Sequence, residues 1–465
     1  MKLMYLRITA VTFALCCLLT TTAQTTKGKP SYETYFHTAE LPDASVYLPA
    51  PPDTSSVAFV DDFMQWVWGK SVRNTLRGIQ ASDDSYYGAG RLAQVFGDAI
   101  GIRISRKETP AMWRLIHRVG ETGNKATNLA KRKYMRRRPF MVINERTWGK
   151  YDDEADLRPN GSFPSGHTGF GWSAALAMAE VAPEAQDTLL RKGYEYGESR
   201  VIVGAHWQSD VDAGYMAASA AWARMHTSSE YINDLKEAKA EYRRIKGIKT
   251  KKVEAEYPRV ERVMNLPSDS STFRMYGDWS AYWLSKSVRE TERGQEAVED
   301  ADCTEESFMN CFSPCVKMTL SEKDTPQIAE LMKKVFAELC VVSGDAKDAT
   351  FRTRPFARMG ESSGIEELND HYLKSSSFPS AHSMLGWGLA LALVEVMPDC
   401  QNELLLRGYE YGRSRTILGL HFESDVKAGR VMAACALARM HADTDFLKMM
   451  EEARKEYTKL KKRQN

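Results

Sequence analysis

The fold class is decided by one stretch of sequence, Pro164-Ser-Gly-His-Thr-Gly-Phe-Gly-Trp-Ser-Ala-Ala-Leu-Ala-Met-Ala-Glu-Val-Ala-Pro183. Residues 169–181 are rich in Ala, Leu and Met, with little β-branching until their end, which favours a helix. A segment of this length is too long for a typical strand and predicts a buried core helix. Pro183 follows where a helix that has just ended tolerates proline.

The same pattern returns at residues 383–396, which are followed by Pro398. The stretches 230–246 and 446–461 predict amphipathic surface helices. Alternating strand patterns are scarce, and the one extended-looking piece is an N-terminal arm at residues 47–52. The sequence therefore predicts an all-α fold.

Comparison of the chain with itself reveals a tandem duplication. Lys70-Ser-Val-Arg73 returns as Lys286-Ser-Val-Arg289, and Gly193-Tyr-Glu-Tyr-Gly197 returns as Gly408-Tyr-Glu-Tyr-Gly412. A period of this size indicates a duplicated domain rather than a solenoid. We expect a first repeat at residues 31–246, a linker at 247–257 and a second repeat at 258–465. The basic residues near the linker favour a solvated charge run over a nucleic-acid contact.

The first 23 residues predict a secretory signal peptide. Lys2 and Arg7 precede an apolar run over residues 8–19, and small residues follow up to a cleavage site near Ala23. The run is short for an uncleaved membrane anchor, and a lipoprotein site at Cys16 is disfavoured because Leu15 is not small. No later apolar run approaches the roughly 20 residues that span a bilayer. We expect a periplasmic or secreted protein whose mature chain has no membrane span.

Charge and cysteine content narrow the possible partners. The chain carries a net charge of +2, and removal of the signal peptide with its two basic residues leaves it neutral, so nothing points to nucleic acid or a membrane surface. Six cysteines remain, and an even number in an exported chain favours disulfides, with Cys303, Cys311 and Cys315 close enough to pair. A zinc site is the alternative, but the Cys311–Cys315 spacing lacks a second pair.

A set of polar residues recurs in both repeats at matching intervals. The first repeat has Lys131, Arg138, Ser165, His167, Arg200, His206 and Asp210. The counterparts in the second are Lys347, Arg354, Ser380, His382, Arg415, His421 and Asp425. Taken singly, each signal is weak, because a basic run is usually solvated and a lone histidine is usually structural. The same intervals from Lys to Arg, from Arg to His and from His to Asp make coincidence implausible.

These residue types suit phosphoryl transfer. A phosphate monoester brings up to two negative charges, which the lysine and two arginines of one repeat can match, and arginine can bind its oxygens in bidentate fashion. Ser165 adds a hydroxyl donor and Gly166 a backbone donor for the phosphoryl oxygens. One histidine can attack phosphorus while the other protonates the leaving oxygen, and an aspartate can fix the tautomer of the first.

The order Lys-x6-Arg-Pro, Pro-Ser-Gly-His and Ser-Arg-x5-His-x3-Asp resembles the signature of the phosphatidic-acid-phosphatase type 2 superfamily. Residues 161–168 and 206–212, together with the N-terminal arm, are similar to the class A bacterial non-specific acid phosphatases in particular. The resemblance covers nearly all of the chain after the signal peptide, twice. It implies two copies of an all-helical phosphatase/haloperoxidase-type bundle, packed as an intramolecular pseudo-dimer. It also implies an acid phosphatase that hydrolyses small phosphate monoesters without a metal or other cofactor.

The resemblance further implies a role for each matching residue. His206 is the nucleophile that forms a phosphohistidine, Asp210 orients it and His167 is the general acid. In the second repeat these roles fall to His421, Asp425 and His382. The phosphoryl group would be held in the first repeat by Lys131, Arg138, Ser165, Gly166 and Arg200. It would be held in the second by Lys347, Arg354, Ser380, Ala381 and Arg415.

The second repeat departs from the signature where Ala381 stands in place of Gly166. Alanine keeps a backbone N–H, but it resists a positive φ and adds a methyl group beside the phosphate. Three other functions stay open. They are a vanadium-dependent haloperoxidase with the same pocket, a lipid phosphatase, whose relatives usually carry the signature between membrane spans, and a phosphate-binding module with an inactive second repeat.

Overall fold

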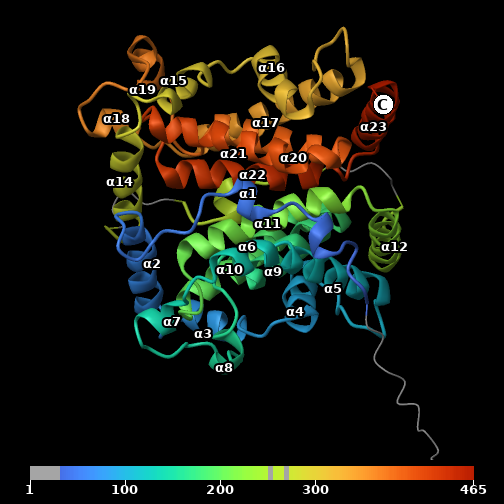
Figure 1. The fold of residues 1–465 in the computed structure, drawn as a ribbon. Coiled ribbons are helices and arrows are strands. Elements are labelled where there is room, and N and C mark those ends of the chain that lie inside the picture. Colours follow the sequence, from blue (N-terminus) through green and yellow to red (C-terminus); the bar gives the residue numbers. More distant parts are fainter. Residues whose placement is uncertain (1–31, 250–254, 267–271, 465) are drawn as a thin grey trace, which may run out of the picture. The chain divides into compact units, whose positions relative to one another are not determined.

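A computed structural model describes residues 32–249, 255–266 and 272–464, and these ranges contain helices and no strand (Figure 1). The two predicted core helices are α9 (Gly166–Val181) and α20 (Ala381–Val396). Every residue of α9 is buried, as are all but the first of α20. The predicted all-α fold is therefore confirmed. The predicted signal peptide with its cleavage site lies outside the described residues.

The helices occur in two series that follow the duplication. The first is α1 (Ala44–Tyr47), α2 (Phe59–Ser71), α3 (Leu76–Asp83), α4 (Ala89–Ile100), α5 (Pro110–Lys125), α6 (Asn128–Tyr134), α7 (Pro139–Val142), α8 (Glu154–Leu157), α9, α10 (Gln186–Ile202), α11 (Gln208–Met225) and α12 (Ser229–Lys246). The second is α13 (Val260–Val263), α14 (Thr272–Lys286), α15 (Glu292–Glu299), α16 (Glu305–Val316), α17 (Pro326–Ala349), α18 (Pro355–Arg358), α19 (Asn369–Leu373), α20, α21 (Gln401–Ile417), α22 (Glu423–Met440) and α23 (Thr444–Gln464). Helix α9 packs against α5, α10 and α11, and α20 packs in the same way against α17, α21 and α22.

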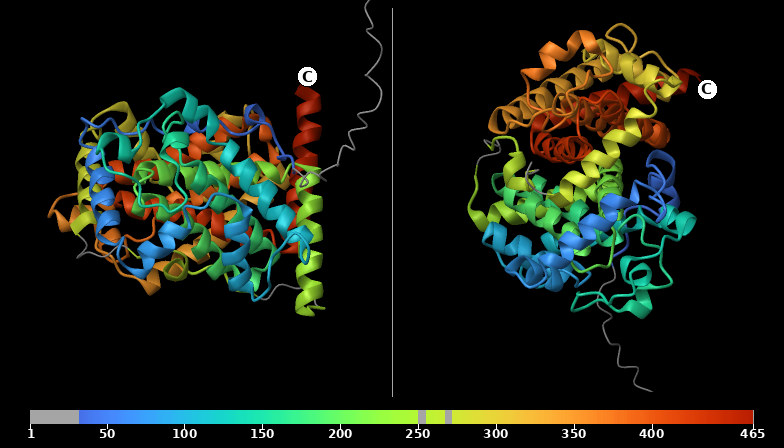
Figure 2. Two further views of the ribbon diagram at one scale, coloured as in Figure 1. Left: turned by 90° about the horizontal axis from the view of Figure 1, so that it is seen from below. Right: turned by 90° about the vertical axis from the view of Figure 1, so that its left-hand side faces the viewer.

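The two series pack against each other through matching helices. Helix α11 contacts α20 and α22, α9 contacts α22, and α2 contacts α14. In two views the warm colours of the second series lie beside the cool colours of the first (Figures 1 and 2). Lys427 crosses the boundary to Asp212 at 2.8 Å and to Asp61 at 3.4 Å. Gly277 leaves room for Asp61, since a Cβ at Gly277 would lie 2.2 Å from its carboxylate.

Two sequence-based expectations need correction. All six cysteines from Cys303 to Cys435 are free thiols, so the predicted disulfides are wrong. Cys311 and Cys315 both lie on α16, where side chains one turn apart run parallel instead of facing each other as a disulfide requires. The zinc alternative fails as well, because the candidate metal cluster among the described residues contains no cysteine. The predicted extended arm is also shorter than expected, since Tyr47 ends helix α1.

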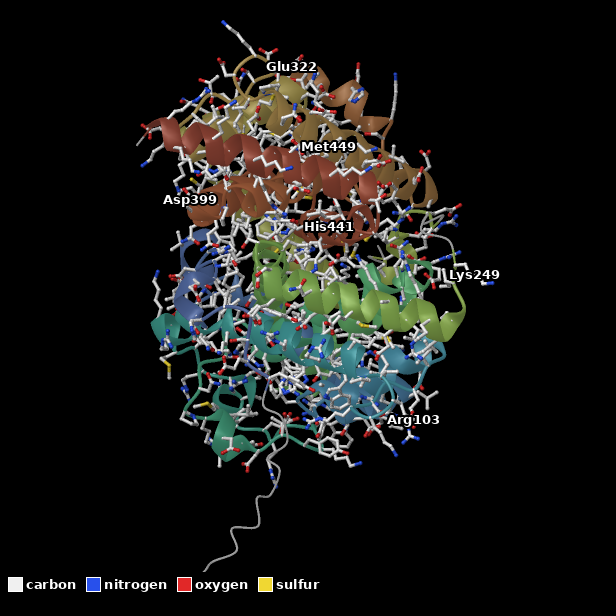
Figure 3. The ribbon with its side chains drawn as sticks, turned by 90° about the vertical axis from the view of Figure 1, so that its right-hand side faces the viewer. Arg103, Lys249, Glu322, Asp399, His441 and Met449 are labelled. Carbon is white, nitrogen blue, oxygen red and sulfur yellow. The ribbon has the colours of Figure 1, made fainter. Side chains whose placement is uncertain are left out.

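A buried cluster of two histidines and two glutamates lies where the two series meet. His441 marks this place in Figure 3. Its Nδ1 donates to the Leu437 carbonyl at 2.8 Å, so its Nε2 faces the Glu395 carboxylate at 3.0 Å. His226 repeats the pattern against Glu180 at 3.3 Å, and the two imidazole centroids are 4.1 Å apart.

Protons, rather than a metal ion, satisfy the charges of this cluster best. Donor atoms of His226, Glu395 and His441 lie within 4.8 Å of one another, a spacing that would admit a cation. However, Lys239 approaches the Glu180 carboxylate at 3.6 Å, and Arg454 binds that of Glu395 at 3.0 Å. The carboxylates of Glu180 and Glu395 thus each already have a cation. A histidine Nε2 beside a carboxylate oxygen makes a hydrogen bond only when it is protonated, and a protonated nitrogen cannot bind a metal ion.

We expect the contribution of His441 to the free energy of unfolding to be largest in mildly acidic solution. Burial opposes the charge of His441, but Glu395 outweighs it and raises the histidine pKa, so this stabilisation is lost as pH rises through the raised value. Burial likewise opposes ionised Glu180, but its cationic neighbours lower its pKa to about 2, so its contribution persists far below the ordinary glutamate range. In denaturant unfolding this contribution should be about 1–2 kcal/mol larger at pH 5.5 than at pH 8.5.

The control for this prediction is His441→Gln, which removes the titrating group and keeps a polar side chain. The unaltered protein should exceed this variant in stability by more at pH 5.5 than at pH 8.5. An equal difference at both pH values would show that the cluster contributes nothing to the pH dependence.

Candidate active site

The recurring polar residues lie at the first turns of matching helices. Ser165 is the N-cap of α9, and its Oγ accepts the Thr168 N–H at 3.2 Å. Asp210 lies in the first turn of α11, and its carboxylate accepts the Trp207 N–H at 2.8 Å. Ser380 and Asp425 cap α20 and α22 in the same way. Each site therefore faces helix N-termini, whose free N–H groups and dipoles favour anions.

His206 is held in one tautomer. Its Nε2 lies 2.9 Å from Arg138 Nη1, and its Nδ1 lies 3.3 Å from Ser162 Oγ and 3.5 Å from Asp210 Oδ2. Since a guanidinium group only donates, Nε2 must accept, and the ring proton must be on Nδ1. The Nε2 lone pair therefore faces the arginine-lined side of the site.

His421 has the same orientation with a different Nδ1 partner. Its Nε2 lies 3.0 Å from Arg354 Nη1, and its Nδ1 donates to the Ser377 carbonyl at 2.6 Å. Asp425 is farther away, at 3.8 Å from Nδ1. Burial, followed by the nearby arginine, lowers the pKa of His206 and of His421 well below the ordinary histidine value. Both rings are therefore neutral even in acid.

Arg200 and Arg415 each present buried N–H groups without an acceptor. Arg200 Nη2 bonds Asp152 at 2.7 Å, whereas its Nε and Nη1 have no hydrogen-bond partner among the described residues. Arg415 Nη2 contacts the Tyr372 hydroxyl at 3.0 Å, and within the same part of the chain its Nε and Nη1 have no partner. Unpaired buried donors are rare because they are costly, and they often mark the position of a ligand.

Positive charge is concentrated beside these arginines. Lys131 is 5% exposed, and its Nζ donates to the Gly161 carbonyl at 2.7 Å. Burial and then Arg138 lower the pKa of Lys131 well below its ordinary value, and Lys347 falls to about 7 for the same reasons. Burial and then Arg200 lower the pKa of Arg138 to about 10. Crowded cations of this kind favour a bound anion.

His167 is the second histidine of the first site. Its ring stacks on Tyr196 at 4.3 Å, and its Nε2 donates to the Asp84 carbonyl at 2.7 Å. Burial and then Arg200 lower its pKa well below the ordinary value. His382 has the matching place, with Nε2 3.2 Å from the Ala301 carbonyl.

A chain of buried ion pairs, which the sequence patterns did not reveal, lies behind each site. Arg136 donates to Asp210 at 2.7 Å and to Asp62 at 2.6 Å, and all three side chains are buried. Arg352 links Asp425 to Asp278 in the second repeat. Arg136 belongs to a run of basic residues, and such runs are usually exposed to solvent. Its match to Arg352 at the repeat interval was the signal that could have identified it.

The replacement of Gly166 by Ala381 does not require an unusual backbone. Both residues begin a helix, and neither has a positive φ. The restriction at Gly166 is steric, because an added Cβ would lie 2.1 Å from Asn124 Oδ1. The repeat interval places Cys340, which has no such oxygen, at the position of Asn124. The methyl group of Ala381 is therefore compatible with its surroundings.

Comparison with known proteins identifies the family. Residues 122–233 and 334–447 both match the family model described as the PAP2 superfamily. A protein of Providencia stuartii named non-specific acid phosphatase is 42% identical over 213 residues, which are 46% of this chain and 86% of that protein. The chain belongs to the PAP2 superfamily. It contains two tandem PAP2 copies.

Other PAP2 relatives give the same picture. A non-specific acid phosphatase of Salmonella typhimurium is 38% identical over 208 residues, 44% of this chain and 83% of its own length. An acid phosphatase of Zymomonas mobilis is 32% identical over 219 residues, 47% of this chain and 81% of its own length. Each of these relatives is thus a little over half as long as this chain. Within the described parts of the chain, no helix is both long and apolar enough to cross a membrane.

Proposed function

We propose that the protein is an exported acid phosphatase that hydrolyses small phosphate monoesters at two sites through phosphohistidine intermediates. The observation that carries the proposal is that each copy has a histidine Nε2 that accepts from one buried arginine and a second arginine whose buried N–H groups have no acceptor among the described residues. The names of the relatives, acid phosphatase in each case, support the same chemistry. Export would produce a mature chain that begins near Gln24.

The first half of the reaction transfers the phosphoryl group to the enzyme. Lys131, Arg138 and Arg200, with Ser165 and the Gly166 N–H, hold the phosphoryl oxygens. Nε2 of His206 attacks phosphorus, the N–P bond forms and the ester P–O bond breaks. His167 gives a proton to the leaving oxygen, and Asp210 supports the charge on His206.

The second half returns the enzyme to its starting state. Water attacks the phosphohistidine while His167 takes the water proton, so that inorganic phosphate leaves and both histidines are restored. Lys131, Arg138 and Arg200 bring three cations to the site, which favours an anion over a metal ion, and we therefore propose a metal-independent reaction.

The second PAP2 copy would perform the same steps. Its nucleophile would be His421 with Asp425, and its general acid His382. The phosphoryl group would be held by Lys347, Arg354, Ser380, Ala381 and Arg415. We assign the copies to residues 31–246 and 258–465, joined by a linker at 247–257.

The value of kcat/KM should decrease as pH rises through the acidic range. This parameter reports the pKa of the free enzyme, where burial and Arg200 hold the pKa of His167 well below its ordinary value. The protonated acid is therefore lost below pH 6.5, while burial and Arg138 lower the pKa of His206 as well and so favour its neutral, nucleophilic form. Hydrolysis of p-nitrophenyl phosphate from pH 4 to 8, corrected for ionisation of the substrate, should decrease by about tenfold per unit on its alkaline side. A rise in kcat/KM towards pH 8 would contradict these roles.

A further inference from the structure

The two sites differ at the residue that contacts the second phosphate-binding arginine. We propose that Asp152 acts as an internal competitor for phosphate at the first site, and that Tyr372 makes the second site the tighter phosphate binder. This inference rests on the proposed function, since it assumes that Arg200 and Arg415 hold the phosphoryl group. It predicts that product inhibition is weaker at the first site than at the second.

Asp152 occupies an N–H group of Arg200 that a bound phosphate would need. Its Oδ1 accepts from Arg200 Nη2 at 2.7 Å, and the two side chains are only 4% and 2% exposed. The other N–H groups of Arg200, on Nε and Nη1, face no acceptor. A phosphoryl group on these N–H groups would meet a carboxylate bound to the same guanidinium, and buried like charges repel strongly. Phosphate must therefore either displace Asp152 or bind beside it at a cost.

The position of Asp152 is fixed by the segment that carries it. The Trp148 N–H donates to the Val203 carbonyl at 2.8 Å, and the Tyr151 N–H donates to Ser85 Oγ at 2.9 Å. The carboxylate packs on Gly149, where an added Cβ would lie 2.2 Å from Asp152 Oδ2. The contact between Asp152 and Arg200 is thus held by its surroundings, as a competitor that returns after each turnover must be.

Tyr372 places a neutral group at the second site. Its hydroxyl lies 3.0 Å from Arg415 Nη2, and its ring covers the Arg354 guanidinium at 4.7 Å. A hydroxyl can turn its proton towards a phosphate oxygen, so it adds a donor where Asp152 adds a negative charge. Tyr372 is 8% exposed, and it therefore supplies this donor with little competition from water.

The test compares inhibition by inorganic phosphate in single-site enzymes. His421→Ala leaves the first site and His206→Ala leaves the second, and the inhibition constant should be higher for the first. Adding Asp152→Asn to His421→Ala should lower it by about 5- to 20-fold, because the amide keeps the shape and removes the charge. The matched control is Asp156→Asn, which changes an exposed aspartate on the nearby helix α8 and should leave the constant unchanged.

A direct binding measurement separates the failure of this proposal from failure of the proposed function. Titration calorimetry with inorganic phosphate on the full chain needs no turnover and should show two classes of site. Asp152→Asn should tighten only the weaker class, whereas Tyr372→Phe should weaken only the tighter one. Unchanged or weaker phosphate binding by Asp152→Asn would overturn the role of Asp152. Loss of all activity in both single-site enzymes, with this binding intact, would instead overturn the two-site mechanism.

Discussion

The double variant His206→Ala/His421→Ala should lose at least about 10³-fold in kcat, while each single variant keeps the turnover of the other site. The reason is geometric. Each Nε2 is directed by its own arginine, Arg138 or Arg354, and each site has its own set of the groups that we propose to bind phosphate. Removal of one proposed nucleophile leaves the groups around the other histidine in place.

Turnover of p-nitrophenyl phosphate by the purified full chain measures this effect, with circular dichroism as the check on folding. The control is His226→Ala, which removes a buried histidine that belongs to neither site. If His206→Ala alone abolished turnover, the second copy would not be an independent catalyst. If the double variant kept its turnover, neither histidine would be the nucleophile.

Arg136→Ala should lower the free energy of unfolding by about 3–5 kcal/mol. Arg136 bonds both Asp62 and Asp210, whose side chains are 2% and 0% exposed. Burial opposes the charge of Asp210, but Arg136 and His206 hold its pKa below the ordinary value. Loss of the arginine therefore leaves two buried carboxylates without their cation. Activity should fall as well, because Asp210 then loses the partner that fixes it beside His206.

The control for this variant is the adjacent residue in the basic run. Arg137 is exposed and donates to the Met141 carbonyl, so Arg137→Ala should change stability by less than about 0.5 kcal/mol. Urea unfolding of both variants gives the comparison. Equal stability of the two would show that the buried ion pairs contribute nothing net.

The sequence was sufficient where a residue type has few alternative uses. The apolar, Ala-rich segments could only be core helices, and the repeated intervals around His206 and His421 identified the groups that the structure brings together. The duplication supplied this information, because residues that are the same in both repeats could be distinguished from neighbours that differ.

The rest depended on contacts between distant residues. Arg136 and Arg137 are indistinguishable in the sequence, yet one is paired with two buried aspartates and the other is exposed. Asp152 and Tyr372 come from segments that do not align between the copies, so their matching positions beside Arg200 and Arg415 could not be seen. The predicted disulfides failed because cysteine count and export say nothing about side-chain direction.

The most direct test of two histidine-based sites is to trap the covalent intermediate. The full chain, mixed with p-nitrophenyl phosphate and quenched in alkali within milliseconds, can be digested and mapped by mass spectrometry. The proposed chemistry predicts phosphohistidine at both His206 and His421, with His206→Ala losing only the first modification. A phosphoryl group on any other residue, or turnover without phosphorylation of either histidine, would contradict it.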